Sequence, residues 1–167
     1  NSLNNIGVVH AEKGDYDTAL DYYGRSLAIK EELGDKSGMG VALNNIGLGR
    51  LDKGDYEKAL DYYDRSLAIA EELGNKRLMG ASLDNLGVSY QNKSDYEKAL
   101  DYKERALTIK EEIGDKYGMG YSLNNIGGVY YDKGDYDKAL DYYERSLAIA
   151  EELGDKRGMG YSLNNIG

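Results

Sequence analysis

The chain of 167 residues contains no cysteine, proline, phenylalanine or tryptophan, and its one histidine is His10. Without cysteine there is no disulfide, no thiol nucleophile and no thiolate ligand, which fits a reducing compartment. A single imidazole cannot make a histidine metal site, and no serine or cysteine arrangement is available to make it a catalytic base. We therefore predict a non-enzymatic protein without a metal or other cofactor, in which His10 has a packing role.

Positive charge is also scarce, because 21 lysine and arginine residues face 30 acidic residues and the net charge is −9. Contacts with nucleic acid phosphates or an anionic membrane surface require clustered lysine and arginine, so neither partner is expected. The sequence opens with no basic and apolar leader, and no apolar run approaches the roughly 20 residues of a membrane span. The chain is predicted to be cytoplasmic.

Repetition is what the sequence has in abundance. The same sequence motif recurs every 40 residues and ends in a glycine, at Gly7, Gly47, Gly87, Gly127 and Gly167. A fixed period in this range is typical of stacked repeat arrays. We predict a single array over residues 1–167, with units at 1–34, 35–74, 75–114 and 115–154 and a partial unit at 155–167. Both ends cut a unit, so a longer array is expected.

Each unit contains two helical patterns separated by short breaks. In the first copy Leu3, Ile6 and His10 lie on one helix face, with Gly7 beside them. Glycine in a helix costs up to about 1 kcal/mol relative to alanine, so its recurrence predicts a neighbouring helix that passes too close for a side chain. At the breaks, as in Gly14-Asp15, glycine is placed to end one helix and aspartate to cap the next. Connections this short predict antiparallel helices.

These patterns resemble the tetratricopeptide repeat family. The family's first helix is matched by Leu123, Ile126-Gly127 and Tyr130, and its second by Gly134, Tyr136, Ala139, Tyr143 and Ser146. The resemblance implies an all-α, right-handed α-solenoid of antiparallel helix pairs, in which the first helix of each pair lines a concave groove.

Two departures from the family pattern concern length. The period exceeds the usual spacing of roughly 34 residues, and the proline that follows the second helix is replaced by Glu31, Glu71, Glu111 and Glu151. The second helix is therefore expected to continue for about another turn to Gly34, Gly74, Gly114 and Gly154. Units of this length resemble those of kinesin light chains, Pins-type adaptors and prokaryotic signalling proteins.

Two kinds of site are disfavoured by their context. Adjacent glutamates such as Glu31-Glu32 do not face each other on a helix, so they are interpreted as a solvated face rather than a catalytic pair. The glycine-rich stretch from Gly154 to Gly160 follows a helix instead of a strand and lacks the Gly-Lys-Ser/Thr ending of a phosphate loop. Helix capping explains this stretch better.

Asparagines are the most informative polar residues. The first row comprises Asn4, Asn44, Asp84, Asn124 and Asn164, and the second row, one residue later in each unit, comprises Asn5, Asn45, Asn85, Asn125 and Asn165. By resemblance these rows line the groove, where amides that both donate and accept suit the backbone of an extended peptide. The alternative is that they hydrogen-bond between neighbouring helices and hold the stack. Both interpretations remain open.

Positions that differ among the copies are expected to be free of stacking requirements and tuned to a ligand. One row is Val8, Leu48, Val88 and Gly128, a second is Ala11, Leu51, Gln91 and Tyr131, and a third is Val41, Ala81, Tyr121 and Tyr161. Aliphatic early units and tyrosine-rich later ones suit a peptide or amphipathic helix with apolar anchors. The predicted function is a protein interaction scaffold that binds such a partner segment.

Two other functions are compatible with the sequence. The cut ends would expose complementary apolar faces, so identical chains could stack head to tail in a structural array. The chain could also be the regulatory segment of a larger signalling protein.

Overall fold

The computed structural model describes residues 2–167, which form nine helices and no strand. Five of them come from the first pattern of each unit and are called A helices here: α1 (Ser2–Glu12), α3 (Lys36–Asp52), α5 (Lys76–Asn92), α7 (Lys116–Asp132) and α9 (Lys156–Ile166). The other four are called B helices: α2 (Tyr16–Glu32), α4 (Tyr56–Glu72), α6 (Tyr96–Glu112) and α8 (Tyr136–Leu153). The prediction of an all-α fold is confirmed.

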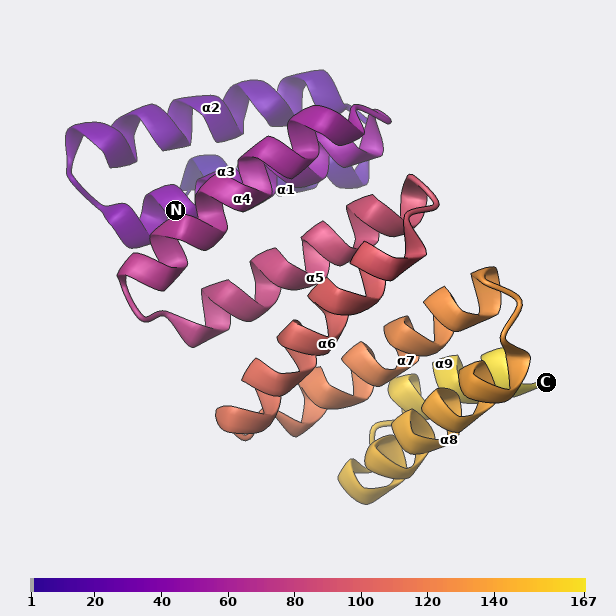
Figure 1. Ribbon diagram of the computed structural model, residues 1–167. Coiled ribbons are helices and arrows are strands. Elements are labelled where there is room, and N and C mark those ends of the chain that lie inside the picture. The colour runs from indigo at the N-terminus through magenta and orange to yellow at the C-terminus, as the bar shows by residue number, and fades with distance from the viewer. Residues whose placement is uncertain (1) are drawn as a thin grey trace.

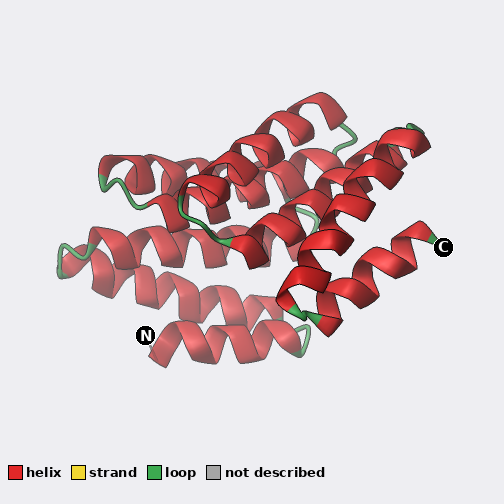
Figure 2. Cartoon of the chain, turned by 90° about the horizontal axis from the view of Figure 1, so that it is seen from below, coloured by secondary structure: helices red, strands yellow, loops and turns green. Residues whose placement is uncertain are grey.

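The helices form successive hairpins, each laid beside the one before it (Figure 1), and the two termini lie at opposite ends of the stack (Figure 2). The A helices α3, α5 and α7 each pack against the B helix before and the B helix after them, while α1 packs against α2 and α9 against α8. In addition α1 contacts α3, α3 contacts α5 and α7 contacts α9, whereas no two B helices in the described chain make a comparable contact. The A helices are therefore the closely spaced layer, on the inner side of the curve.

Local chemistry explains where the helices begin and end. Left-handed glycines follow them, as at Gly14 (φ 77°) and Gly54 (φ 75°), because glycine has no Cβ to clash in that conformation. Aspartates cap most helix starts, so that Gly38 N donates to Asp35 Oδ1 at 2.8 Å. The B helices end at or next to Leu33, Leu73, Ile113 and Gly154, which confirms the expected extra turn.

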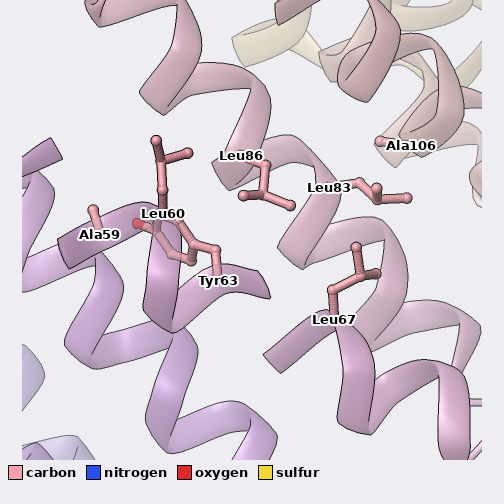
Figure 3. Close-up of a cluster of buried hydrophobic side chains, with 7 residues drawn as sticks. All are labelled: Ala59, Leu60, Tyr63, Leu67, Leu83, Leu86 and Ala106. Atoms are coloured by element: carbon pink, nitrogen blue, oxygen red, sulfur yellow. The ribbon is translucent and has the colours of Figure 1, made fainter. Parts of the chain in front are cut away.

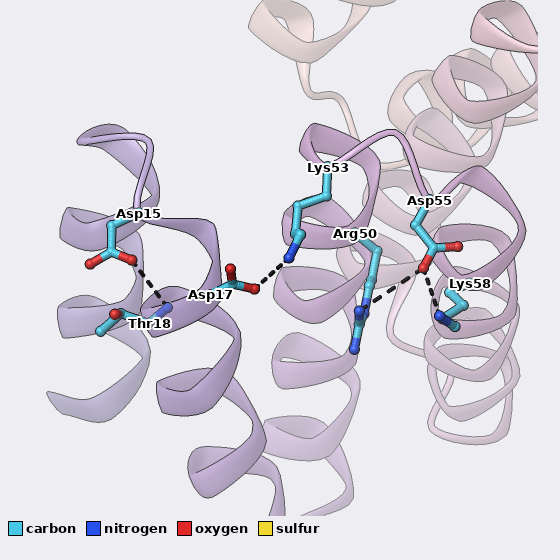
Figure 4. Close-up of polar contacts among 7 residues, drawn as sticks. All are labelled: Asp15, Asp17, Thr18, Arg50, Lys53, Asp55 and Lys58. Carbon is cyan, nitrogen blue, oxygen red and sulfur yellow. Dashed lines mark hydrogen bonds and ion pairs between the residues drawn. The ribbon is translucent and has the colours of Figure 1, made fainter.

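Charged side chains tie neighbouring helices together at the ends of the hairpins (Figure 4). Lys53, just after α3, pairs with Asp17 in the first turn of α2. Asp55, before α4, makes no capping bond with a backbone N–H and instead meets Lys58 Nζ at 2.8 Å and Arg50 Nη1 at 4.0 Å. These pairs are partly or largely exposed to solvent, so each contributes at most about 1 kcal/mol.

The recurring glycine of the A helices is explained by a ring from the partner helix. A Cβ atom on Gly47 would lie 2.5 Å from Cε1 of Tyr63, and one on Gly127 would lie 2.7 Å from the ring of Tyr143. This confirms the expected close approach and shows that a tyrosine side chain of the B helix causes it.

The core is built from leucines, alanines and isoleucines between these layers. Around α5 it comprises Ala59, Leu60, Tyr63, Leu67, Leu83, Leu86 and Ala106, so that α4 and α6 are joined through α5 (Figure 3). His10 lies at the edge of the first hairpin, where its ring stacks on Tyr22 with centroids 5.6 Å apart. The same stacking joins Tyr90 to Tyr102 and Tyr130 to Tyr142, so His10 has the predicted packing role.

Candidate partner-binding face

The candidate site is the inner surface of the A helices, which we call the A-helix face. It comprises the three variable rows and the second asparagine row identified in the sequence. Its exposed apolar members are Val8, Val41, Leu48, Tyr121, Tyr131 and Tyr161, each with at least 40% of its surface accessible. Large apolar side chains at exposed positions of one layer are a common feature of binding surfaces.

The rows are not uniformly exposed. Leu51 is half-buried because it packs against the core cluster around α5, and Val88 and Gln91 are half-buried as well. Gln91 Nε2 donates to Asp132 Oδ2 at 2.7 Å, which joins α5 to α7. The first two rows are therefore most open on α1, α3 and the end of α7, at Val8, Leu48 and Tyr131.

The first asparagine row works mainly within the stack. Asn44 is buried, and its Oδ1 accepts a bond from Ser82 Oγ at 3.3 Å. Asn124 is half-buried, and its Oδ1 accepts from Asn165 Nδ2 at 3.0 Å, which joins α7 to α9. Asn4 is buried with its Oδ1 unpartnered. These contacts match the stack-holding interpretation of the amides.

The second asparagine row is more available. Asn5, Asn125 and Asn165 are exposed, and Asn45 and Asn85 are half-buried. Apart from Asn165, their side-chain amides bond to no side chain among the residues that the structure describes. Unpaired amides on an inner face can donate to a carbonyl and accept from an N–H of a bound backbone.

Beneath the face lies Lys103, which the sequence analysis did not single out. It stands on α6 where the other B helices carry Tyr23, Tyr63 and Tyr143, and only 1% of its surface is exposed. Burial lowers the pKa of its amine to about 8, against the opposing effect of the Asp84 carboxylate. Comparing the copies of the second pattern position by position would have found this exception.

A pocket at the C-terminal end of the face also escaped the sequence analysis. It lies between α7, α8 and α9 and is rimmed by Tyr117, Tyr121 and Tyr161, with Ile149 and Ala150 among its lining residues. The tyrosine rings of Tyr121 and Tyr161 meet edge to face at 6.4 Å. Tyr121 and Tyr161 were predicted to be groove residues, but the space below them depends on small residues elsewhere in the chain.

Residues 2–167 hold no group of three or more histidine, aspartate or glutamate side chains placed to bind a metal ion. No helix among them combines the length and the apolar character needed to span a bilayer.

Comparison with known families decides the classification. The sequence matches the tetratricopeptide repeat family over residues 1–72, 38–112 and 118–167. The chain belongs to the tetratricopeptide repeat family. No curated protein sequence matches it.

Solved structures share this fold. Aspartyl phosphate phosphatase F from Bacillus subtilis superposes with a TM-score of 0.89 at 22% identity, over 96% of this chain and 42% of that one. A Rap protein complexed with Competence and Sporulation Factor gives 0.82 at 19% identity, over 95% and 45%. A kinesin-light-chain structure of Podosopora anserina with nearly identical TPR-like repeats gives 0.80 at 14% identity, over 99% and 82%. The chain thus spans less than half the length of the phosphatase and of the Rap protein.

Proposed function

We propose that this tetratricopeptide array is a non-enzymatic interaction scaffold that binds a peptide or amphipathic helix of a partner protein on its A-helix face. The observation that carries the proposal is the co-location, on one inner layer, of exposed apolar side chains and unpaired amides. Val8, Leu48 and Tyr131 supply apolar area, while Asn5 and Asn125 supply donors and acceptors. A bound segment needs both kinds of contact.

Solved relatives support the class of function. The Rap protein mentioned above contains this fold over 45% of its length and is complexed with a named factor. The negative charge of the present chain favours a partner segment with a positive balance, because complementary charge steers association. The partner is therefore expected to combine apolar anchors with basic residues.

The test compares partner capture by groove and control variants. Asn85→Ala combined with Asn125→Ala removes two amides of the second row, neither of which bonds to another side chain in the described structure. Proteins captured from a cell lysate by the wild type are identified by mass spectrometry, and the strongest is purified and titrated by calorimetry. We expect affinity to fall about tenfold, or roughly 1.4 kcal/mol, with helical content unchanged.

Thr108→Ala is the matched control because Thr108 is exposed on α6, outside the A-helix face, where Ala28, Ala68 and Ala148 occupy the equivalent positions. It should leave affinity unchanged. An asparagine double variant that binds as tightly as the wild type would remove the support for this face.

A second candidate function is head-to-tail stacking of identical chains. Ile6 on α1 and Leu163 on α9 are 39% and 54% exposed, whereas their counterparts Ile46 and Leu123 are buried. Light scattering over a dilution series separates the two functions, because a scaffold that only binds partners keeps a constant monomer mass. A mass that rises with concentration, and falls again when Ile6 is replaced by lysine, would favour stacking.

A further inference from the structure

The pocket between α7, α8 and α9 lies where a B helix meets the next A helix, and the chain contains three equivalent junctions in which a side chain fills the corresponding space. Each of these B–A junctions contains one residue from the last turns of the B helix and one from the first turn of the A helix. The B-helix positions are Lys30, Ala70, Lys110 and Ala150, and the A-helix positions are Gly38, Leu78, Gly118 and Gly158. The combination of these two side chains differs from junction to junction.

The α4–α5 junction is filled by a leucine. Leu78 is 7% exposed, and its Cδ2 lies 2.6 Å from the place where a Cβ atom on Gly40 would stand. Its B-helix partner is the small and fully buried Ala70, and the helix cap beside it is the neutral Asn75. At this junction, a large apolar residue on the A helix is therefore combined with a small residue on the B helix and an uncharged helix cap.

The α2–α3 junction is filled by a lysine. Lys30 Cδ lies 2.7 Å from the place of a Cβ atom on Gly38, so the lysine stem occupies the space that leucine occupies elsewhere. Lys30 Nζ then donates to Asp35 Oδ2, the cap of α3, at 2.6 Å. This hydrogen bond is the main reason why the pKa of Asp35 is lowered.

The α6–α7 junction is also filled by a lysine. Lys110 Cδ lies 2.9 Å from the place of a Cβ atom on Gly118. Its amine continues to Asp84 Oδ2 at 2.5 Å and Ser122 Oγ at 2.7 Å. Glycine on the A helix thus goes with lysine on the B helix, and the amine finds a carboxylate.

The α8–α9 junction has neither filling. Ala150 and Gly158 are both small, and Ala150 Cβ lies 3.2 Å from the place of a Cβ atom on Gly158. The result is a narrow pocket that is partly open to solvent. Its apolar lining comes chiefly from Gly120, Ile149, Ala150 and Leu153, and its mouth from Tyr117, Tyr121 and Tyr161.

The carboxylate that a lysine would meet is nevertheless present. Asp155 caps α9 as Asp35 caps α3, and it lines the pocket. Its Oδ1 accepts from the backbone N–H of Arg157 at 3.1 Å, and it forms no ion pair within residues 2–167. The side chain of Arg157 turns instead to Tyr161, with Nε 3.1 Å from the phenol oxygen and the guanidinium 5.6 Å from the ring centre.

We propose that this pocket binds a lysine side chain of the partner segment, with the stem against Ile149, Ala150 and Leu153 and the ammonium group on Asp155. The lysine-filled α2–α3 junction is the internal template, because it has the same glycine and the same aspartate cap. Leucine occurs only beside the uncharged Asn75, so the aspartate favours a cation. The tyrosine rings at the mouth and the net charge of −9 also favour the binding of a cation.

This inference rests on the proposed function only in assigning the lysine to a partner. The site itself is testable with a small probe. n-Butylammonium reproduces the lysine side chain, and n-butanol is its uncharged equivalent. In amide NMR spectra, n-butylammonium should produce saturable shifts at Gly120 and Gly158. Asp155→Asn should weaken this binding by about tenfold, the effect of one charge-assisted hydrogen bond. Equal shifts with n-butanol would show a purely apolar pocket and would overturn the proposal.

Two variants in which a side chain fills the pocket serve as controls. Both reproduce combinations of side chains that occur at other junctions of this chain. Ala150→Lys copies the α2–α3 junction, and Gly158→Leu combined with Asp155→Asn copies the α4–α5 junction. Both should abolish the response to n-butylammonium while the helical spectrum is retained. Persistence of the saturable shifts in both variants, or their absence in the wild type, would overturn the proposed site.

Partner binding separates this inference from the proposed function. A partner that loses affinity with the asparagine double variant and also with Ala150→Lys supports both. If Ala150→Lys binds that partner as the wild type does, the pocket does not hold a partner lysine, although the A-helix face still binds. If the asparagine variant binds normally while n-butylammonium occupies the pocket, the proposed function fails and the ammonium site stands.

Discussion

The α4–α5 and α6–α7 junctions have the same backbone arrangement and opposite polar chemistry. At the α4–α5 junction neutral groups form a chain, in which Ser66 Oγ donates to Gly40 O at 2.8 Å and Ser82 Oγ lies 3.0 Å from Ser66 Oγ and 3.3 Å from Asn44 Oδ1. At the α6–α7 junction an ionic group replaces this chain, because Lys110 reaches Asp84 and Ser122.

The replacement involves several positions at once. Ala106 stands where Ser66 stands, Asp84 where Asn44 stands, and Lys103 where Tyr63 stands. Each junction fills its volume and satisfies most of its polar atoms, but with different residues. At these two junctions the array therefore constrains volume and hydrogen bonding rather than residue identity. The α8–α9 junction keeps the serine chain, because Ser146 Oγ donates to Gly120 O at 2.8 Å and Ser162 Oγ to Ser146 Oγ at 3.0 Å, but its volume is left unfilled, which makes it informative.

The largest effect is expected from truncating the leucine that both junctions share. Leu67 and Leu107 are buried at equivalent positions, 8% and 9% exposed. Leu67→Ala and Leu107→Ala should each lower the free energy of unfolding by roughly 2–5 kcal/mol, measured by urea denaturation. A loss confined to one of them would show that the two cores are not packed equivalently.

The next effect separates the ionic junction from the neutral one. Asp84→Ala leaves the ammonium of Lys110, only 13% exposed, without its carboxylate, which should cost about 2–3 kcal/mol. The matched change Asn44→Ala removes a neutral acceptor and should cost about 1 kcal/mol. Equal losses in urea denaturation would contradict the difference that the hydrogen bonds indicate.

A pH-dependent effect is expected from the buried lysine. The pKa of Lys103 is lowered from 10.5 to about 8 in the folded chain, chiefly by desolvation, while Asp84 and Asp132 favour and Lys110 disfavours its charge. Below about pH 8 both states carry the proton, so the folded state bears the whole cost of burying the ammonium. Between about pH 8 and pH 10.5 the unfolded chain binds more protons than the folded chain, so stability rises with pH.

Lys103→Tyr restores the residue of the other B helices and removes this cost. It should raise the free energy of unfolding near neutral pH by on the order of 1–3 kcal/mol, with the gain shrinking as the pH rises above about 8. Urea denaturation of both proteins across this pH range measures the difference. A gain that stays constant with pH would mean that the amine is not titrating in the folded chain.

The smallest effect concerns the turn between the A and B helices. Gly54 and its equivalents are left-handed, and Ser94 adopts the same conformation with φ 59° although it carries a Cβ. Ser94→Gly should therefore stabilise the chain by about 1 kcal/mol. Gly54→Ser is the converse control and should destabilise by a similar amount. Thermal melts of both variants check the pair.

Much of the fold was predictable because it depends on local signals that recur in each copy. The glycine of the A helix predicted a close neighbour, and the tyrosine ring above Gly47 confirms it. The aspartate or asparagine before each of the helices α2 to α9 predicted a cap, and of these only Asp55 makes no capping bond.

The site was less predictable because it depends on which side chains meet across helices. Asn44 and Asn45 are adjacent in sequence, yet Asn44 is buried on a junction and Asn45 is half-buried on the A-helix face. The pocket depends on two small residues on different helices, Ala150 on α8 and Gly158 on α9. Neither residue alone indicates a pocket in the sequence. The unfilled space can be predicted only by comparing this pair with the equivalent pair Lys30 and Gly38, in which the lysine fills it.

The central claim is that a partner segment lies against the inner layer of this array. A photo-crosslinking amino acid at Leu48, on the A-helix face, tests it directly against the same amino acid at Ala68, exposed on α4. With the purified partner, we predict a crosslinked product from position 48 and none from position 68. Crosslinking from position 68 alone would place the partner on the B helices and contradict the account.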